Sequence, residues 1–438
     1  MKITIIGTGY VGLVSGACFS EFGFHVTCVD KDSDKIERLK NGEIPIYEPG
    51  LEDLVARNAA AGRLDFTMDL AASVARADAV FIAVGTPARR GDGHADLSYV
   101  YAAAREIAEH LSGYTVVVTK STVPVGTGRK VASILAEANP DADVDVASNP
   151  EFLREGSAIT DFMRPDRVVV GTDSARARDV MRELYRPLYL LETPILFTSL
   201  ETSELIKYAA NAFLAVKISY INQMADLCEK VGADVHDVSK GMGLDKRIGG
   251  KFLHPGPGYG GSCFPKDTLA LVKTAEDFNA SVSIVEDVVR YNDARKKSMA
   301  ARVIAAAGGD VSGKVIAILG LAFKPETDDM RDSPSLDMIP LLMEAGASIN
   351  AYDPAAMEQA APLLPKDVNY CKSALETVSS ADITVIVTEW NEFRALAPAD
   401  LASAMRGDIV VDLRNIYDPA ALGRAGLMVS NIGRPQQV

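Results

Sequence analysis

The clearest candidate for chemistry in this sequence is Cys263, which lies in the glycine-rich run GYGGSCFPKD at 258–267. A structural cysteine usually lies in an apolar stretch, whereas this one has glycines before it and Lys266 and Asp267 close behind it. It has no partner at metal-ligand spacing, so we expect no metal site. A nearby lysine can stabilise a thiolate, the form of cysteine that acts as a nucleophile. The pattern favours a nucleophile and leaves a structural cysteine as the alternative.

A second set of polar side chains lies on a long predicted helix that begins near residue 200. Glu204, Lys207 and Asn211 are three and four residues apart, so they share one helical face. Lys207 and Asn211 interrupt an apolar stripe, where an unpaired charge would be costly to bury. This face is either a solvated edge of the helix or part of a site in which Lys207 and Asn211 point at a reacting oxygen.

A glycine-rich turn near the N-terminus predicts a dinucleotide site. The sequence GTGYVG, at 7–12, follows the strand-like KITII and opens a helix. Gly7 permits the tight turn, Gly9 lets a pyrophosphate approach the backbone, and Gly12 lets helix and strand pack closely. Asp30 ends the next strand at the spacing of a carboxylate that binds a ribose 2′-hydroxyl and repels a 2′-phosphate. The pattern therefore favours NAD over NADP.

An alternation of strands and helices carries these residues and predicts a doubly wound parallel sheet. The strand-like segments are short and rich in β-branched residues, as expected for strands buried on both faces. In an open parallel sheet, ligands lie beyond the carboxyl ends of the strands. Thr86 and Thr122 follow two of these strands, so they either contact the cofactor or belong to ordinary turns. The expected strands cover residues 3–6, 26–29, 78–87, 114–124, 143–152 and 166–172.

The character of the sequence changes near residue 200, where a segment without Pro or Gly runs to Gly232. At ~1.5 Å per residue it predicts a helix of roughly 40 Å or more, a bridge between domains and a candidate dimer surface. Strand–helix alternation resumes at Val315 without the first part's glycine signature. The fold class is therefore α/β, with two Rossmann-like doubly wound parallel-sheet domains joined by a central helical region. The expected domains span 1–199, 200–308 and 309–438.

Length and composition restrict the class of protein. With 438 residues the chain is too long for one hydrophobic core. Its 59 acidic and 45 basic residues give a net charge of −14, which argues against binding to nucleic acid or to an anionic membrane. The five cysteines are scattered and form no CxxC pair, which favours a reducing cytoplasm. A strand-like start leaves no room for a signal peptide, and no apolar run approaches the ~20 residues of a membrane span.

Taken together, the motifs resemble those of the UDP-glucose 6-dehydrogenase family, within the UDP-glucose/GDP-mannose dehydrogenase superfamily. They run in family order from the N-terminus to about residue 335, and more weakly to VVDLRN near 410. We recognise no motif in residues 355–405. The matching stretches are GTGYVGL, VGTP, STVPVGT, NPEFLREG, ELIKYAANAFLA, GMGLDKRIGGKFLHPGPGYGGSCFPKD and GLAFKPETDDMRDSP.

The resemblance implies four-electron oxidation of UDP-glucose to UDP-glucuronate, with two NAD⁺ and a C-terminal domain that binds UDP. An aldehyde must first become a thiohemiacetal before a second oxidation can give a thioester, which water then hydrolyses. The proton acceptor of the first oxidation is either Lys207 or a water-linked carboxylate. The catalytic residues implied are Cys263 as the thiol, Lys207 and Asn211 for the oxyanion, Asp267 and Thr122 for water, and Glu151 for hydrolysis.

The same resemblance implies two sets of binding residues. In the NAD set, Lys35 follows Asp30 closely enough in the sequence to reach the adenosine part of the cofactor. The NAD set is Gly7, Gly9, Tyr10, Val11, Gly12, Asp30, Lys35, Thr86, Thr122, Glu155, Lys266 and Arg331. The UDP-sugar set is Glu151, Phe152, Leu153, Arg154, Glu155, Lys207, Asn211, Phe252, His254, Pro255, Gly256, Pro257, Gly258, Tyr259, Gly260, Phe323, Lys324 and Arg414, with Arg247 from across a dimer interface.

The expected partners are UDP-glucose and a second copy of the chain, which forms a homodimer through the central helices or a larger assembly. The nearest alternative is a related sugar-nucleotide 6-dehydrogenase that uses GDP-mannose or a UDP-N-acetylhexosamine. An NAD- or nucleotide-sensing protein without catalysis disagrees with the intact Cys263, Lys207, Asn211 and Asp267. A two-electron alcohol dehydrogenase would have no need of Cys263. We expect the two glycines Gly260 and Gly261, with Gly258, to let the backbone crowd the sugar.

Overall fold

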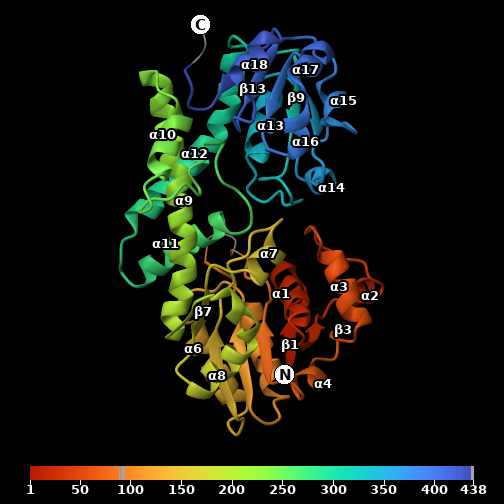
Figure 1. Ribbon diagram of the computed structural model, residues 1–438, viewed down its shortest axis with the longest axis vertical. Helices are drawn as coiled ribbons and strands as arrows, with labels where there is room; N and C mark the ends of the chain where they lie inside the picture. Colours follow the sequence, from red (N-terminus) through yellow and green to blue (C-terminus); the bar gives the residue numbers. More distant parts are fainter. Residues whose placement is uncertain (88, 90–93, 436–438) are drawn as a thin grey trace. The chain divides into compact units, whose positions relative to one another are not determined.

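The computed structural model describes residues 1–87, 89 and 94–435 (Figure 1). A parallel sheet lies at the centre of each of its two α/β parts, drawn in red to yellow and in blue in Figure 1. The chain forms two compact units. The first comprises Met1–Ala210 and Lys273–Ala280, and the second comprises Asn211–Val272 and Ser281–Val438.

The sheet of the first unit has eight strands, and most of its strand residues are buried. The strands are β1 (Lys2–Ile6), β2 (His25–Val29), β3 (Leu64–Thr67), β4 (Ala79–Ile82), β5 (Thr115–Thr119), β6 (Val144–Ser148), β7 (Val168–Gly171) and β8 (Ile195–Thr198). Their order is β3-β2-β1-β4-β5-β6-β7-β8. All neighbours are parallel except β6 and β7, which meet antiparallel at Ser148 and Gly171. The sheet is thus parallel as predicted, apart from this one pairing.

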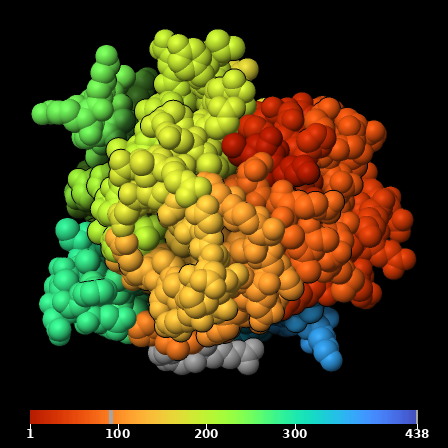
Figure 2. Space-filling model, turned by 90° about the horizontal axis from the view of Figure 1, so that it is seen from below, coloured from red at the N-terminus to blue at the C-terminus, as the bar shows by residue number. Residues whose placement is uncertain are grey.

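Helices cover both faces of this sheet, as a doubly wound fold requires. They are α1 (Tyr10–Glu21), α2 (Ser33–Lys40), α3 (Leu51–Ala60), α4 (Leu70–Val74), α5 (Ser98–Ala108), α6 (Thr127–Ala138), α7 (Ala158–Met163), α8 (Ala175–Leu184) and the 3₁₀ helix η1 (Arg186–Leu191). One apolar core includes side chains of α1, α3, α7 and α8, and a second includes those of α4, α5 and α6. Figure 2 shows one face of the molecule, on which red to yellow residues of this unit are prominent.

Four helices follow the first α/β part. They are α9 (Leu200–Val231), α10 (Val235–Gly243), α11 (Phe264–Asp277) and α12 (Ser283–Ala306). Helix α9 has 32 residues, which correspond to roughly 48 Å at 1.5 Å per residue. The predicted long helix is confirmed. Neither helix nor strand forms between Lys251 and Cys263, the loop that holds the cysteine.

The second sheet repeats the order of the first six strands of the first sheet. Its strands are β9 (Val315–Leu319), β10 (Ser348–Tyr352), β11 (Asn369–Tyr370), β12 (Ile383–Ile386), β13 (Ile409–Asp412) and β14 (Met428–Asn431). They pair in parallel in the order β11-β10-β9-β12-β13-β14. The associated helices are α13 (Pro334–Glu344), α14 (Met357–Ala360), α15 (Ala374–Val378), α16 (Asn391–Ala395), α17 (Pro398–Ala404) and α18 (Pro419–Arg424). The predicted pair of doubly wound α/β parts is confirmed.

The turns that follow β1 and β9 have the same local geometry. Gly7 and Gly320 have φ values of +99° and +96°. The N–H of each donates at 2.8 Å to the carbonyl of the last residue of the neighbouring strand, Val29 or Tyr352. The two α/β parts, whose similar architecture the sequence indicates, thus also share the backbone geometry of the turn after their first strand.

Candidate functional site

The glycine turn after β1 leaves space at the start of α1. A Cβ atom at Gly7 would lie 2.7 Å from the Ala83 carbonyl oxygen, and one at Gly12 would lie 1.9 Å from the Gly7 oxygen. Gly9 differs, because among the described residues no heavy atom lies within 4 Å of its Cβ position. Gly9 stands at the N-cap of α1, and having no side chain it makes no cap hydrogen bond to the first amides of the helix. Free amides and open space at a helix N-terminus fit the pyrophosphate of NAD.

Asp30, directly after β2, holds this turn in place. Its Oδ2 accepts hydrogen bonds from the Thr8 amide at 2.8 Å and the Thr8 hydroxyl at 2.6 Å. Lys35 on α2 lies 3.3 Å from the same oxygen. Burial raises the pKa of Asp30, but the bonds from Thr8 and the Asp32 amide and the charge of Lys35 together leave the pKa lowered. A carboxylate at this position can accept from a ribose hydroxyl while Thr8, which the sequence reasoning missed, orients it.

The loops after β4 and β5 are tied to each other and to α9. The Thr86 hydroxyl donates to the Thr122 carbonyl at 3.0 Å. Glu204 on α9 accepts from the amides of Gly126 and Gly128 at 2.7 and 2.6 Å. Burial raises the pKa of Glu204 to about 7, although these two amides lower it. Glu204 therefore stabilises the start of α6, and with it the loop that carries Thr122.

Lys207 is buried in an ion pair and does not lie on a solvated edge of α9. Its Nζ donates to Glu151 Oε1 at 3.0 Å, and the two side chains are 3% and 5% exposed. The other Glu151 oxygen accepts from the Leu153 amide at 2.5 Å. The Lys207 ammonium also lies 5.3 Å from the centre of the Phe152 ring. Lys207 is thus a cation held in low dielectric, where it can strongly stabilise a negative oxygen.

A second buried lysine, Lys120, interacts electrostatically with this pair and was missed by the sequence reasoning. Lys120 follows β5 directly and donates to Asn149 Oδ1 at 3.0 Å and to the Tyr185 hydroxyl at 3.2 Å. Burial lowers the pKa of Lys120 to about 8, with Glu151 acting in the opposite direction and Lys207 in the same one. A lysine at the end of the apolar run TVVVT was the signal in the sequence.

Cys263 is the cysteine whose surroundings fit a reactive thiol. All five cysteines are free, and four are buried while Cys263 is half-buried. Its carbonyl accepts from the Asp267 amide at 2.8 Å, so Cys263 lies at the N-terminus of α11. The positive end of a helix dipole favours an anion there, as it does for nucleophilic thiolates. The Ser262 hydroxyl lies 3.5 Å from the sulfur.

Asp267 is buried between two donors. Its oxygens accept from Asn211 Nδ2 at 2.6 Å and from Lys266 Nζ at 2.7 Å. Asp267 is 1% exposed and Asn211 is 7% exposed, so Asn211 does not lie on a solvated face either. Lys207 and Asn211 are one turn apart on α9, and each bonds to a buried carboxylate of its own unit, Glu151 or Asp267.

The glycines of the Cys263 loop are needed for packing against the protein itself. A Cβ at Gly261 would lie 2.6 Å from the Phe323 ring, and one at Gly260 would lie 2.4 Å from the Asp332 carbonyl oxygen. At Gly258 it would lie 2.9 Å from the Lys296 side chain. The absence of side chains at these three positions therefore lets the loop pack closely against neighbouring residues, and whether its backbone also crowds the sugar stays a prediction.

The remaining residues of the UDP-sugar set fall into two groups. In the first unit, Arg154 pairs with Asp161. In the second unit, Arg414 donates to the carbonyls of Val387 at 2.6 Å and Phe323 at 2.9 Å. The Lys324 ammonium lies 5.4 Å from the Phe323 ring centre, and the Phe252 ring packs edge-on against Phe264. In the 254–260 loop, His254 is exposed, and Pro255, Gly256, Pro257, Gly258, Tyr259 and Gly260 are buried.

The NAD set is not confined to one unit. Tyr10 on α1 donates to the buried Glu48, which also accepts from the Gly156 amide at 2.6 Å, next to Glu155. Val11 lies on α1 and packs against the first core. Lys266 and Arg331 belong to the second unit, where Lys266 pairs with Asp267 and Arg331 with Asp329. Glu48 was missed because it stands in a loop without a motif.

Metal binding and membrane insertion find no support in the part of the chain that is described. Over residues 1–87, 89 and 94–435, no group of three His, Cys, Asp or Glu side chains could hold a metal ion. Nor does any helix of these residues have both the length and the apolar character to cross a membrane.

Three family models match consecutive parts of the chain. All are of the UDP-glucose/GDP-mannose dehydrogenase family: its NAD binding domain matches residues 1–189, its central domain 201–294, and its UDP binding domain 317–419. A UDP-glucose 6-dehydrogenase of Rhizobium meliloti is 63% identical over 437 residues, which are 99% of this chain and 100% of that protein. The UDP-glucose 6-dehydrogenase TuaD of Bacillus subtilis is 47% identical over 99% of this chain and 93% of its own.

Solved structures agree with these sequence matches. The UDP-glucose dehydrogenase of Pyrobaculum islandicum has a TM-score of 0.91 at 38% identity, covering 99% of this chain and 98% of that one. The UDP-D-ManNAc dehydrogenase of Pyrococcus horikoshii has a TM-score of 0.86 at 28% identity, with both chains covered completely.

Proposed function

Because this chain belongs to the UDP-glucose/GDP-mannose dehydrogenase family, we propose that it oxidises UDP-glucose to UDP-glucuronate with two NAD⁺ per sugar. NAD⁺ takes up two electrons and one hydrogen from the substrate in each of two oxidations. The glycine turn and Asp30 bind this cofactor, with Lys35, Thr86 and Thr122 beside it. The substrate is held by residues 151–155, by the 254–260 loop and by Phe323, Lys324 and Arg414.

Cys263 carries the second half of the reaction. Its sulfur bonds to C6 of the aldehyde, and the aldehyde oxygen takes the proton, which gives a thiohemiacetal. Oxidation of this adduct yields a thioester, and water then displaces the sulfur, so the thiol is regenerated and the sugar leaves as a carboxylate. Lys207 and Asn211 donate to the oxyanion in these steps. Asp267 and Thr122 hold the water, and Glu151 keeps Lys207 in place.

The half-buried thiol at the start of α11 is the observation that carries this mechanism, since a two-electron dehydrogenase would not need it. The choice of UDP-glucose is supported by the relatives described above, since the two with the higher identities have UDP-glucose in their names. The related substrates GDP-mannose and the UDP-N-acetylhexosamines would leave the chemistry unchanged and are separated by experiment. We also expect the enzyme to act in the cytoplasm.

Counting the NADH formed for each sugar nucleotide consumed tests the function. We expect two NADH per UDP-glucose, and no comparable turnover of GDP-mannose or UDP-N-acetylglucosamine under the same conditions. The measurement follows NADH absorbance while the sugar nucleotide is quantified by chromatography. A ratio of one, or a preference for either of the other substrates, would contradict the proposal.

We further propose that the chain forms a homodimer through α9. Phe213, Tyr220 and Leu227 are each seven residues apart and therefore lie along one stripe of the helix. They are 64%, 45% and 50% exposed, which is unusual for large apolar side chains in a row. Arg247, expected to reach across the interface, is 89% exposed in its side chain. A second copy of the chain would cover this stripe.

Replacing Phe213 and Leu227 by Asp should abolish the dimer, because the carboxylates would then be buried in an apolar interface. Light scattering should give twice the chain mass of 46.7 kDa for the wild type and the single mass for the double variant. Leu190→Asp is the matched control, since Leu190 is 88% exposed on η1 but lies off the stripe. A wild type that is monomeric at micromolar concentration, or a double variant that still dimerises, would refute the interface.

A further inference from the structure

The loop that precedes Cys263 obtains its shape from side chains of two helices. Residues 252–262 form neither helix nor strand, yet Gly256 and Tyr259 are buried. The Gly256 amide donates to Asn222 Oδ1 on α9 at 2.8 Å. Asn292 on α12 accepts from the Tyr259 amide at 2.8 Å and donates to the Tyr259 carbonyl at 3.0 Å. Side chains thus supply the hydrogen bonds that secondary structure would otherwise provide.

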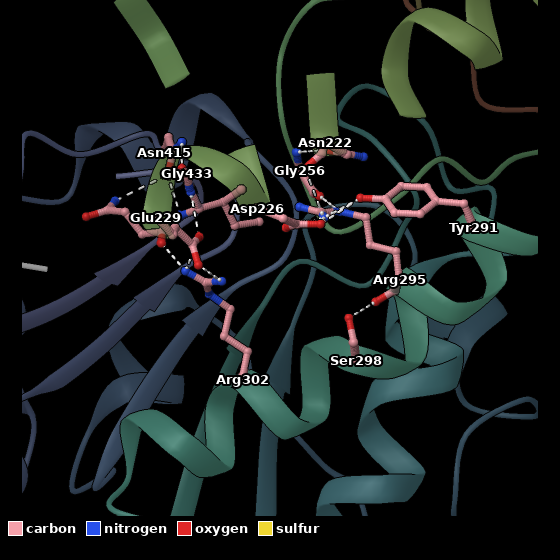
Figure 3. Close-up of polar contacts among 12 residues, drawn as sticks. Asn222, Asp226, Glu229, Gly256, Tyr291, Arg295, Ser298, Arg302, Asn415 and Gly433 are labelled. Carbon is pink, nitrogen blue, oxygen red and sulfur yellow. Dashed lines mark hydrogen bonds and ion pairs between the residues drawn. The ribbon is translucent and has the colours of Figure 1, made fainter. Parts of the chain in front are cut away.

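Arg295, one helical turn after Asn292, completes this arrangement (Figure 3). Its Nε donates to the Gly256 carbonyl at 2.7 Å, so both polar groups of Gly256 are bonded to side chains. Its Nη1 donates to Asp226 on α9 at 2.9 Å and to the Tyr291 hydroxyl at 2.9 Å. Arg295 is 4% exposed, and a charge buried to this degree is costly unless it is paired.

Helix pairing alone does not explain why an arginine stands at this position. Two turns further along α12, Arg302 donates to Glu229 on α9 at 2.8 Å. Arg302 also donates to the Asn431 carbonyl, and Glu229 accepts from the Gly433 amide at 2.7 Å. This second pair joins the same two helices and bonds the C-terminal segment in place of the loop (Figure 3). What distinguishes Arg295 is the bond from its Nε to Gly256.

We propose that Arg295 is a positioning residue for sugar-nucleotide binding, which acts by fixing the Gly256 carbonyl while Asp226 and Tyr291 fix its guanidinium. The proposal rests on the proposed function, in which the 254–260 loop contacts the UDP-sugar. A planar guanidinium can donate in two directions at once, toward the loop and toward Asp226, whereas a lysine ammonium offers only a point charge. Arg295 itself does not need to touch the substrate.

The test is Arg295→Lys, which keeps a cation for Asp226 but removes the planar fork. We expect KM for UDP-glucose to rise about tenfold, with a smaller change in kcat and with KM for NAD⁺ unchanged, because the mispositioned loop mainly weakens binding of the sugar nucleotide. Calorimetric titration should show the same tenfold loss in affinity for UDP-glucose alone. Arg295→Met, which loses both bonds, should show at least the same loss.

Arg302→Lys is the matched control, since it alters the equivalent pair on the same helices without touching the loop. We expect it to lower the midpoint of thermal unfolding about as much as Arg295→Lys and to leave KM for UDP-glucose unchanged. Equal KM values in Arg295→Lys and the wild type, or an equal rise in both lysine variants, would overturn the proposal.

A third measurement separates this proposal from the proposed function. Iodoacetamide labelling of Cys263 requires no substrate, and a displaced loop should change its rate at least threefold in Arg295→Lys but not in Arg302→Lys. If the wild type does not turn over UDP-glucose while this change occurs, the substrate assignment fails and the positioning role stands. An unchanged labelling rate in Arg295→Lys would count against that role even in an active enzyme.

Discussion

Replacing Cys263 by Ser should reduce turnover of UDP-glucose at least about 10³-fold, because the hydroxyl cannot provide a thiolate and the thioester route is lost. Binding should survive, since the sulfur contributes little to holding the nucleotide. Mass spectrometry of the wild type, quenched during turnover, should show a sugar adduct on the peptide that contains Cys263, and none on the variant. Turnover of the variant at the wild-type rate would show that Cys263 is not the nucleophile.

The other cysteines provide the control for this experiment. Burial raises the pKa of Cys228, and it raises those of Cys18 and Cys28 to about 12. Cys228→Ser makes the same substitution in the same unit at a thiol that is 4% exposed. It should retain turnover within about twofold and lose some stability. Iodoacetamide should label Cys263 in preference to the other four thiols, and UDP-glucose should protect it.

The α/β class and the long helix were predictable because their signals are local. A short β-branched strand followed by a glycine turn describes β1 and α1 within the first 21 residues. Strands β3 and β8 were not predicted. The sequence LDFT of β3 lacks the continuous apolar character of the inner strands, and β8, with the sequence ILFT, is only four residues long and lies at the edge of the sheet. The direction of β7 also could not be read, since residue pattern does not encode which way a strand runs.

The candidate site was predictable only where a motif carries it. Cys263, Lys207 and Asn211 stand in such stretches, whereas their supporting residues do not. Asn222 and Arg295 look like surface polar residues of two helices until folding places both against the Gly256 peptide. Glu48 likewise stands in an unremarkable loop and meets Tyr10 across 38 residues of sequence. Partners that are distant in the chain require tertiary structure.

Replacing Lys120 by Met should stabilise the fold more at pH 7 than at pH 10.5, by about 3 kcal/mol in the free energy of unfolding. Burial lowers the pKa of Lys120 to about 8, whereas a lysine in the unfolded chain has a pKa near 10.5. Each pKa unit corresponds to about 1.4 kcal/mol. The neighbours stay satisfied in the variant, because the Tyr185 hydroxyl still donates to Asn149 at 2.6 Å and Asn149 to the Val169 carbonyl at 2.8 Å.

The pH dependence gives the sharper test of the same substitution. Between pH 8 and pH 10.5 the unfolded wild type binds more protons at Lys120 than the folded protein does, so its unfolding free energy rises with pH. The advantage of Lys120→Met should therefore be complete below pH 8 and vanish toward pH 10.5, as measured by urea unfolding at each pH. Lys40→Met, at an exposed lysine of α2, should show no such trend. A constant difference across this range would mean that Lys120 is not held in its costly protonated form. If this trend is found and the variant also loses turnover, the charge of Lys120 lowers stability but is needed for activity. Its role is then electrostatic, through its effect on Glu151 and Lys207.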